Sequence, residues 1–516
     1  FFATFSAGDA VDGGLGTDVL NLAGNYAGGV TMTATTLLNM EKIVFADGFS
    51  YKLTSHNATV GAGKLLTLDG SALGAASALT FDGSAETDGS FSFLAGLGND
   101  VLTGGSGADT FDLRSGGKDK AVGGGGADTF LLGATLASTD TIDGGAGSDI
   151  LIVDGDYSAG LALSGVTNVE TLKLTAGHSY AITAPDSAVA AGMTMTIDGS
   201  KLGVGDVLTF KGSAELDGNY AILAGAAADT ITTGAGNDSV DAGGGDDFLD
   251  LRAGGIDTLT GGSGNDTFRF GATLTQQDKV DGGSGNDLVT LEGDYSAGVV
   301  FNATTLVNVE TLRLVGGHSY QLTLNDTTVA AGKTITIDGG DLGSADHLIL
   351  DGSKELDGSL TLNGGAGGDT LTGGAQGDKL RGGMGADVQN GKAGADVFQY
   401  KAAAESTGAG YDTIVGMDFS SDHIAVKSNV SGVDATIAGA ALSTAHFDSD
   451  LAAAADAAHL LRHHAAFVKV ASGDLAGDIF LVIDQNGTAG YQAGADIVIL
   501  MQNAQNMSGI DVSDFR

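Results

Sequence analysis

Short runs in which apolar and polar residues alternate recur along the whole chain, separated by Gly and Asp. In the stretch 143–280 they include Thr171–Leu174, Thr194–Ile197, Leu208–Phe210 and Ala221–Leu223. Alternation with β-branched residues between turn formers is typical of strands, and the frequent Gly disfavours helices. The pattern predicts an all-β fold of short strands at regular intervals.

One stretch has helical periodicity instead. In Ser449–His464 the apolar residues Leu451, Ala455, Ala458 and Leu461 recur at helical spacing. On such a helix His459 and His463 would share a face, as residues four apart do. A metal-binding histidine pair is one interpretation; surface or interface histidines are the commoner arrangement, and we favour them.

The chain contains three copies of a long unit followed by a different C-terminal segment. DGGLGTDVL at 12–20 recurs as DGGAGSDIL at 143–151 and as DGGSGNDLV at 281–289. The sequence after each also matches: NMEKI at 39–43 corresponds to NVETL at 168–172 and 308–312. We therefore divide the chain into copies at 1–142, 143–280 and 281–400 and a C-terminal segment at 401–516.

Each copy ends in a ladder of glycine-rich nonapeptides, at about 95–131, at about 224–269 and at 364–399. The last ladder reads GGAGGDTLT, GGAQGDKLR, GGMGADVQN, GKAGADVFQ, with Asp at every sixth position. Gly permits turn conformations with positive φ, and the residues after each Asp suit a short strand. Two such units close one coil of eighteen residues, and successive coils stack about 4.8 Å apart. The ladders thus predict an elongated parallel β-solenoid.

The composition narrows the chemistry of these turns. The chain has 87 Gly, no Cys and a formal net charge of −41. Such acidity argues against nucleic acid as a partner, because phosphate contacts need clustered Lys and Arg. Carboxylates and turn carbonyls are oxygen ligands, which Ca²⁺ prefers, and the units offer no nitrogen or sulfur ligand for Zn²⁺. No apolar window reaches the roughly 20 residues of a transmembrane helix.

These repeats resemble the RTX family of calcium-binding proteins, whose nonapeptides form a β-roll and which type I systems secrete. The resemblance implies several bound Ca²⁺ ions, held by the sixth-position carboxylates and by carbonyls of the glycine turns. The aspartates it indicates are Asp18, Asp100, Asp109, Asp119, Asp128, Asp149, Asp229, Asp238, Asp247, Asp257, Asp266, Asp287, Asp369, Asp378, Asp387 and Asp396. The glycines are Gly105, Gly107, Gly262, Gly264, Gly365, Gly367, Gly374, Gly383 and Gly385.

Some units depart from the family pattern, which weakens the expected sites there. Gln376 replaces the third Gly in the unit of Asp378, and residues 226–228 are all Ala in the unit of Asp229. The units of Asp119 and Asp257 lack the first Gly pair and follow a step of ten residues, which predicts a bulge in the ladder. For Asp18, in an isolated unit, an ordinary β-turn is the alternative.

From residue 401 the pattern changes. The segments 412–426, 480–487 and 495–500 resemble the module that ends many RTX proteins. The resemblance implies a small β-rich cap that closes the roll and carries the uncleaved export signal, although this chain ends differently, in Arg516.

Two functions of different classes are compatible with the sequence. The chain has no GxSxG elbow with plausible triad partners and no HExxH, so we do not expect an enzyme. A Gram-negative surface-layer subunit would form a calcium-held lattice with copies of itself and anchor to surface polysaccharide through N-terminal sequence preceding Phe1. The alternative is the calcium-folded carrier region of a secreted adhesin or enzyme. Both place the chain outside the cell.

Overall fold

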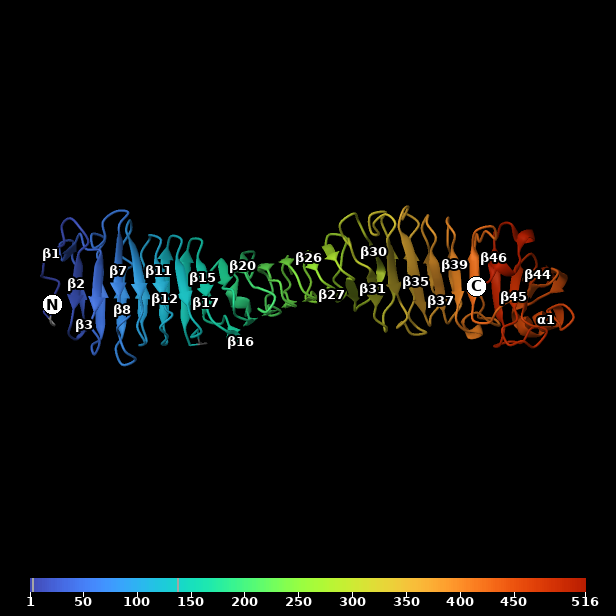
Figure 1. Cartoon of the computed structure of the whole chain (residues 1–516), viewed down its shortest axis with the longest axis horizontal. Helices are drawn as coiled ribbons and strands as arrows, with labels where there is room; N and C mark the ends of the chain where they lie inside the picture. The colour runs from blue at the N-terminus through green and yellow to red at the C-terminus, as the bar shows by residue number, and fades with distance from the viewer. Residues whose placement is uncertain (2–3, 137–138) are drawn as a thin grey trace. The chain divides into compact units, whose positions relative to one another are not determined.

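The computed structural model describes residues 1, 4–136 and 139–516 as two compact units, Phe1–Ser263 and Gly264–Arg516. Short strands account for most of the regular structure in each (Figure 1). The all-β prediction is confirmed, and the four strands predicted between 171 and 223 are present. The division into three sequence copies does not coincide with these units and stays a prediction.

The first unit has one long sheet opposed by two shorter ones. The long sheet runs β2 (Val19–Leu22), β5 (Lys42–Phe45), β7 (Leu65–Asp69), β9 (Ser90–Leu94), β11 (Thr110–Asp112), β13 (Thr129–Leu132), β15 (Ile150–Val153), β18 (Thr171–Leu174), β20 (Thr194–Asp198), β22 (Asn219–Leu223), β24 (Ser239–Asp241) and β26 (Thr258–Ser263). The second runs β3 (Tyr26–Thr31), β6 (Tyr51–Thr54), β8 (Leu79–Asp82), β10 (Val101–Thr103), β12 (Lys120–Gly125), β14 (Thr141–Ala146) and β17 (Val166–Thr167). The third runs β16 (Tyr157–Ala162), β19 (Tyr180–Thr183), β21 (Leu208–Lys211), β23 (Thr230–Thr232) and β25 (Phe248–Asp250), and β1 (Val11–Asp12) pairs with β4 (Leu37–Leu38).

The second unit repeats this arrangement and adds antiparallel strands. One sheet runs β27 (Thr267–Phe270), β29 (Leu288–Leu291), β31 (Thr311–Leu314), β33 (Thr334–Asp338), β35 (Ser359–Gly365), β37 (Lys379–Gly383), β39 (Val397–Tyr400) and β41 (His423–Val426). The other runs β30 (Tyr295–Val300), β32 (Tyr320–Thr323), β34 (Leu348–Asp351), β36 (Thr370–Thr372), β38 (Val388–Asn390), β40 (Asp412–Val415), β46 (Ile497–Gln502), β45 (Ile479–Ile483), β44 (His464–Ser472) and β42 (Gly432–Val433). β28 (Lys279–Ser284) belongs to the same unit, and β43 (Ile437–Ala441) pairs with β44.

Each coil consists of two strands joined by two turns, and successive coils pair in parallel. Val101 of β10 pairs with Thr80 on one side and with Lys120 on the other. The register between β10 and β12 shows no shift, although the ladder there contains the ten-residue step. The prediction of a bulge is therefore wrong: the extra residue lies in the turn after β11, where Arg114 binds the Asp112 carboxylate through its guanidinium group.

The core of the solenoid is a narrow stack of side chains between the two faces. Strand residues alternate between buried and partly exposed, as in β9. Buried positions one coil apart face each other, so Phe93, Phe111 and Phe130 stack with ring centroids 4.8 Å apart at each step. Burial of these rings stabilises the coils that carry them.

The C-terminal segment has a broader core. β44, β45 and β46 pair antiparallel, and residues such as Phe447, Leu451, Phe480 and Val482 form one buried cluster. β46 also pairs in parallel with β40, so this segment covers the end of the second unit's last sheet. The predicted cap is thus present as a β-rich module with one short α-helix.

The helix predicted at Ser449–His464 is too long: α1 covers Phe447–Ala454. His459 and His463 lie beyond it. His459 is hydrogen-bonded to Asp456, whereas His463 has φ 56° and its N–H donates to the Asp484 carboxylate. Because no helix carries these histidines, they do not share a helical face. Single turns of 3-10 helix lie at η1 (Asp186–Ala188), η2 (Ala403–Glu405), η3 (Thr444–His446), η4 (Met507–Gly509) and η5 (Val512–Asp514).

Candidate metal centre

The sixth-position aspartates lie at the turns, directly before a strand, and nearly all are buried. Asp109 precedes β11 and Asp387 precedes β38. Asp18 is half-buried. The fully buried set is Asp100, Asp109, Asp119, Asp128, Asp149, Asp229, Asp238, Asp247, Asp257, Asp266, Asp287, Asp369, Asp378, Asp387 and Asp396. Burial of a carboxylate is costly unless hydrogen bonds or a positive charge compensate for the lost hydration.

Hydrogen bonds join these aspartates into columns that run from coil to coil. The N–H of Asp369 donates to Oδ1 of Asp387, 2.8 Å away and eighteen residues later. The N–H of Asp109 donates to Oδ1 of Asp128 in the same way, at 2.7 Å. Further links join Asp100 to Asp119, Asp128 to Asp149, Asp229 to Asp247, Asp238 to Asp257, Asp266 to Asp287 and Asp378 to Asp396. The predicted residues are therefore brought together as spaced series, and the irregular units of Asp119 and Asp257 keep their places.

The columns include buried acids that the nonapeptide pattern did not predict. The N–H groups of Asp119, Asp387 and Asp396 donate to Asp140, Asp412 and Asp422. These three acids lack the glycine turn, which is why a search for GGxGxD misses them. The available signal was their position at or directly before a strand of the next coil.

The second carboxylate oxygen divides the turns into two classes. In most of the turns that open a column, which we call entry turns, Oδ2 accepts an N–H from its own turn: Gly365 donates to Asp369 at 2.7 Å. The other entry turns with this bond are those of Asp100, Asp109, Asp229 and Asp378. Asp238, which opens the column to Asp257, is an exception, because its buried Oδ2 has no hydrogen-bond partner. In later turns, which we call inner turns, the buried Oδ2 has no hydrogen-bond partner, as in Asp128, Asp149, Asp387 and Asp396. The Oδ2 atoms of Asp18 and Asp287 are in the same state.

The turn glycines place main-chain carbonyls beside these carboxylates. A Cβ at Gly382, the first position of its unit, would lie 2.1 Å from Oδ2 of Asp387. A Cβ at Gly383 would lie 2.1 Å from the carbonyl oxygen of Gly365, and one at Gly385 would lie 2.3 Å from that of Gly367. Gly383 and Gly385 also have φ of 106° and 120°, which glycine adopts without strain. The carbonyls of Gly105 and Gly107 approach Gly124 and Gly126 in the same way.

The remaining predicted glycines occupy equivalent places. Gly262 has φ 102° and Gly264 has φ 130°. The carbonyl of Gly264 faces Gly285 of the next coil. Gly374 donates its N–H to Oδ2 of Asp378, while its carbonyl accepts the N–H of Ala393.

Burial makes these carboxyl groups weak acids in the absence of a cation. It raises the pKa of Asp369 and Asp378, both in entry turns, to about 6. It raises the pKa of Asp387 and Asp396, in inner turns, to about 7. The inner turns lack the N–H that stabilises the charged form in entry turns. The Asp412 carboxyl, which follows Asp387, has its pKa raised to about 9, mainly by burial and then by the Asp387 charge.

This donor set fits calcium. Buried Oδ2 atoms without partners, main-chain carbonyls close by and the absence of ring nitrogens from the ladder turns are the chemistry of a hard-cation site. Bound Ca²⁺ would supply the positive charge that the turns lack. The inner aspartates would act as anionic ligands, and the glycines would allow adjacent coils to approach closely enough to share an ion.

Comparison with known families identifies the repeats. A family model described as the RTX calcium-binding nonapeptide repeat (four copies) matches residues 92–117, 136–157, 223–255, 253–272, 275–294 and 362–398. The chain therefore contains RTX calcium-binding repeats. Calcium is accordingly its ion, with several per chain, and its ladders are RTX β-rolls. The matched segments leave out Asp18, Asp119 and Asp128, whose places in the solenoid come from the structure alone.

No curated protein matches the chain. In the part of the chain that the structure describes, no helix is long and apolar enough to cross a membrane.

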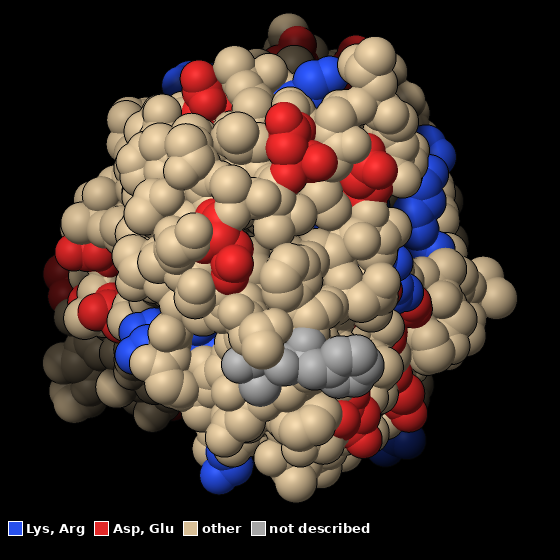
Figure 2. Space-filling model, turned by 90° about the vertical axis from the view of Figure 1, so that its left-hand side faces the viewer, with Lys and Arg blue, Asp and Glu red and all other residues tan. Residues whose placement is uncertain are grey.

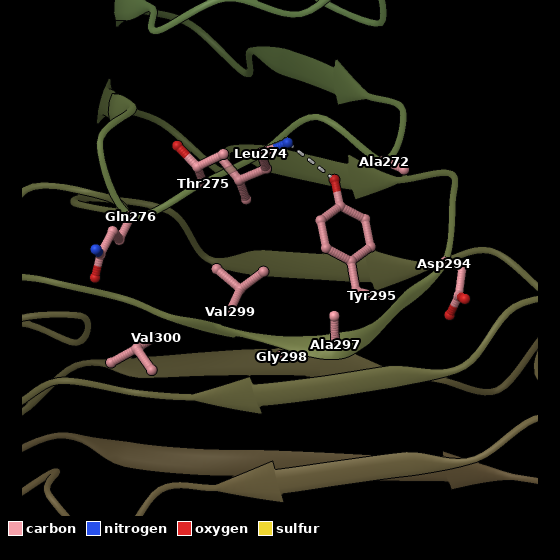
Figure 3. A pocket seen from close by; sticks show the side chains of 10 residues that line it. All are labelled: Ala272, Leu274, Thr275, Gln276, Asp294, Tyr295, Ala297, Gly298, Val299 and Val300. Carbon is pink, nitrogen blue, oxygen red and sulfur yellow. Dashed lines mark hydrogen bonds between the residues drawn. The ribbon is translucent and has the colours of Figure 1, made fainter.

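Other hollows and acidic groups lie outside the ladders. Figure 3 shows a pocket in the second unit where the Tyr295 hydroxyl accepts the N–H of Leu274 at 3.1 Å, beside the apolar Val299. Among the labelled side chains Asp294 alone carries a charge.

Two acid triplets, Asp186–Glu215–Asp217 and Asp326–Glu355–Asp357, bring carboxylate oxygens within 4.8 Å of one another at equivalent positions of copies two and three. Copy one has Asn57 at the first of these positions.

Proposed function

We propose that this protein is a subunit of a bacterial surface layer, secreted through a type I system and folded outside the cell by Ca²⁺. The observation that carries the proposal is the threefold repetition of the whole solenoid unit, including its exposed turns and loops. An exposed strand surface recurs in every copy: in β3, β16 and β30 a buried tyrosine (Tyr26, Tyr157 and Tyr295) is followed by three exposed residues. A protein that presents one surface several times is suited to repeated contacts with copies of itself.

Charge supports a calcium-dependent assembly. The net charge of −41 opposes close approach of two chains unless cations intervene. Figure 2 shows uncharged side chains over most of the face at the N-terminal end of the first unit, with Asp and Glu in several places and Lys and Arg mainly toward its edges. In this proposal the role is structural rather than catalytic, and surface polysaccharide anchors the lattice to the cell.

Secretion follows from the same chemistry. At low cytosolic calcium the ladders would stay unfolded, because their buried carboxylates are not compensated. Millimolar calcium outside the cell exceeds the roughly 10⁻⁴–10⁻³ M dissociation constants typical of extracellular modules. Binding to the folded state alone then drives folding by mass action. An RTX repeat is also typical of secreted proteins.

A second function is the carrier region of a secreted adhesin or enzyme whose active domain precedes this chain. The C-terminal module is equally compatible with this function and with a surface-layer subunit, because it would close the β-roll in either protein.

Assembly distinguishes the two. The purified protein is dialysed into millimolar CaCl₂ and examined by negative-stain electron microscopy and light scattering, with MgCl₂ at equal ionic strength as the control. A surface-layer subunit forms ordered sheets in calcium and disperses in EGTA. A folded monomer that persists at every calcium concentration contradicts the surface-layer proposal and leaves the carrier function.

A further inference from the structure

Each copy contains a second type of turn that continues the acid column without a nonapeptide. It is an Asn-x-Glu turn, formed by residues 39–41, 168–170 and 308–310. Each follows an isolated DGGxGxD unit by one coil, and its Glu precedes a strand: Glu170 comes directly before β18, as Asp149 comes directly before β15. The Glu therefore occupies the place that an Asp has in the ladder.

The hydrogen bond that links the column is also preserved. The N–H of Asp149 donates to Oε2 of Glu170 at 2.7 Å, the same distance at which the N–H of Asp128 donates to Oδ1 of Asp149. The corresponding bonds to Glu41 and Glu310 are both 2.8 Å. The Asn-x-Glu turn has fewer residues than GGxGxD between its first position and its acid. The longer side chain of Glu compensates for this shorter turn.

The Asn has a defined role in the turn. Asn39, Asn168 and Asn308 have φ of 49°, 52° and 50°, a left-handed conformation that Asn adopts more easily than most residues. Their side-chain amides donate to Oδ1 of Asp12, Asp143 and Asp281, at 2.8, 2.7 and 2.8 Å. This accounts for the Asp that precedes the glycine pair in these three units.

The turn brings oxygens together around the first glycine of the preceding unit. A Cβ at Gly144 would lie 1.9 Å from the carbonyl oxygen of Asn168 and 2.6 Å from Oδ2 of Asp149. A Cβ at Gly282 would lie 2.1 Å from the Asn308 carbonyl and 2.7 Å from Oδ2 of Asp287. In the ladder, a Cβ at Gly123 would meet the Gly144 carbonyl and Oδ2 of Asp128 in the same way, at 2.3 and 2.1 Å. The Asn carbonyl thus replaces a glycine carbonyl.

The oxygens at this position include a buried one without a partner. Asp149 and Asp287 are 0% and 1% exposed, and Oδ2 of each has no hydrogen-bond partner. The Asn-x-Glu turns also line cavities. One includes Gly145, Gly147, Asn168 and Glu170 in its lining, and the other includes Gly283, Gly285, Asn308, Glu310 and the basic Lys333. Two carboxylates and a carbonyl with no nitrogen or sulfur ligand favour a hard divalent cation.

We propose that each Asn-x-Glu turn completes a further calcium site with the Asp of the DGGxGxD unit before it, so that Asp18–Glu41, Asp149–Glu170 and Asp287–Glu310 each hold one ion. These sites lie outside the paired nonapeptides. They rest on the calcium chemistry of the ladders and not on the surface-layer function. A failure of the protein to assemble into sheets would therefore not contradict them.

Calcium counting on the full chain tests the proposal. A variant that carries Glu170→Gln and Glu310→Gln is compared with one that carries Asp156→Asn and Asp294→Asn, which removes the same charge from exposed positions of the same two copies. Bound Ca²⁺ is measured by equilibrium dialysis against ⁴⁵Ca, with circular dichroism to verify folding. We expect one ion fewer for each substituted turn in the Glu variant and the wild-type number in the control. The wild-type number in the folded Glu variant would overturn the proposal.

A second variant covers failure to fold. Glu170→Asp with Glu310→Asp keeps both charges but shortens each side chain by one methylene. Because the short turn needs the longer arm, we expect the affinity of those two sites to fall about tenfold or more. Unchanged affinity at every site in this variant would equally contradict the proposal.

Discussion

Entry and inner turns of the last ladder share the glycine-rich motif and its sixth-position Asp, but they differ in how the carboxylate oxygens are hydrogen-bonded. In Asp369 one oxygen accepts the N–H of Leu348 and the other that of Gly365. In Asp387 one oxygen accepts the N–H of Asp369, and the other has no partner. A buried polar atom without a partner costs about 1–3 kcal/mol. Entry turns therefore close with protein groups alone, whereas inner turns are incomplete until a cation binds.

Calcium removal should have the largest effect on the fold. It should act mainly on the inner turns, because their carboxylates lack a protein partner. With EGTA at neutral pH we expect loss of most of the β-sheet circular dichroism, because many inner turns lose their ion together. Hydrogen exchange resolved by mass spectrometry should show β37–β39 losing protection before the apolar cluster of the C-terminal module. Equal protection of the ladder with and without calcium would contradict the claim that inner turns need a bound cation.

Substitution of single aspartates should come next. In saturating calcium, Asp387→Asn should lower the free energy of unfolding by about 2 kcal/mol more than Asp369→Asn, since it removes the charge where no N–H replaces it. At calcium concentrations that only partly saturate the sites the order should reverse, because Asp387→Asn then replaces a buried acid that nothing compensates with a neutral amide. Thermal unfolding of both variants in saturating and in limiting calcium measures this. Equal losses under both conditions would show that the two turn classes do not differ.

Substitution of the first glycine of a unit tests a steric constraint that entry and inner turns share. A Cβ at Gly382 or at Gly364 would lie 2.1 and 2.4 Å from the Oδ2 of its own unit, so both turn classes exclude it. We expect Gly382→Ala and Gly364→Ala each to cost about 1–3 kcal/mol. Gly205→Ala is the control, because a Cβ there meets nothing within 4 Å at an ordinary φ. Chemical denaturation in calcium checks all three, and a large loss at Gly205 would remove the steric explanation.

Among these changes, a change of pH should have the smallest effect on stability. The pKa of Asp387 rises from 3.8 to about 7 in the calcium-free fold. Between these values the unfolded chain has released the proton and the folded chain still holds it, so stability without calcium falls as pH rises. We expect the calcium-free protein to keep more β-sheet circular dichroism at pH 5 than at pH 7.5, with Asp387→Asn reducing this difference more than Asp369→Asn. A stronger β-sheet signal at pH 7.5 than at pH 5 would contradict the assigned direction.

The sequence predicted the coil because its period is visible in single residues: Asp recurs every nine positions and Gly surrounds it. It also predicted the strands between 171 and 223, where alternation is strict. The helix prediction was wrong in its length because it rested only on the spacing of apolar residues. The helix ends at Ala454 although Ala458 and Leu461 continue the period, because the chain turns at Asp456, whose main-chain oxygen accepts the N–H groups of His459 and Leu460.

The site was predictable as a set of aspartates but not as two classes. Whether Oδ2 of an Asp receives an N–H depends on the φ of the second residue of its unit, which sequence does not specify where Gly occupies both kinds of turn. Gly365 and Gly383 are the same residue in the same motif position, yet of the two Gly383 has a positive φ. The acids Asp140, Asp412 and Glu170 were missed because they continue a column without its glycine motif.

The central claim is that an inner carboxylate is a calcium ligand. A crystal structure of the protein grown in calcium, with anomalous differences recorded at long wavelength, tests it directly. We expect an ion within roughly 2.3–2.6 Å of Oδ2 of Asp387, with the Gly365 or Gly367 carbonyl among its other ligands. A well-ordered ladder in which Oδ2 of Asp387 contacts water or a protein N–H, with no anomalous peak beside it, would contradict the claim.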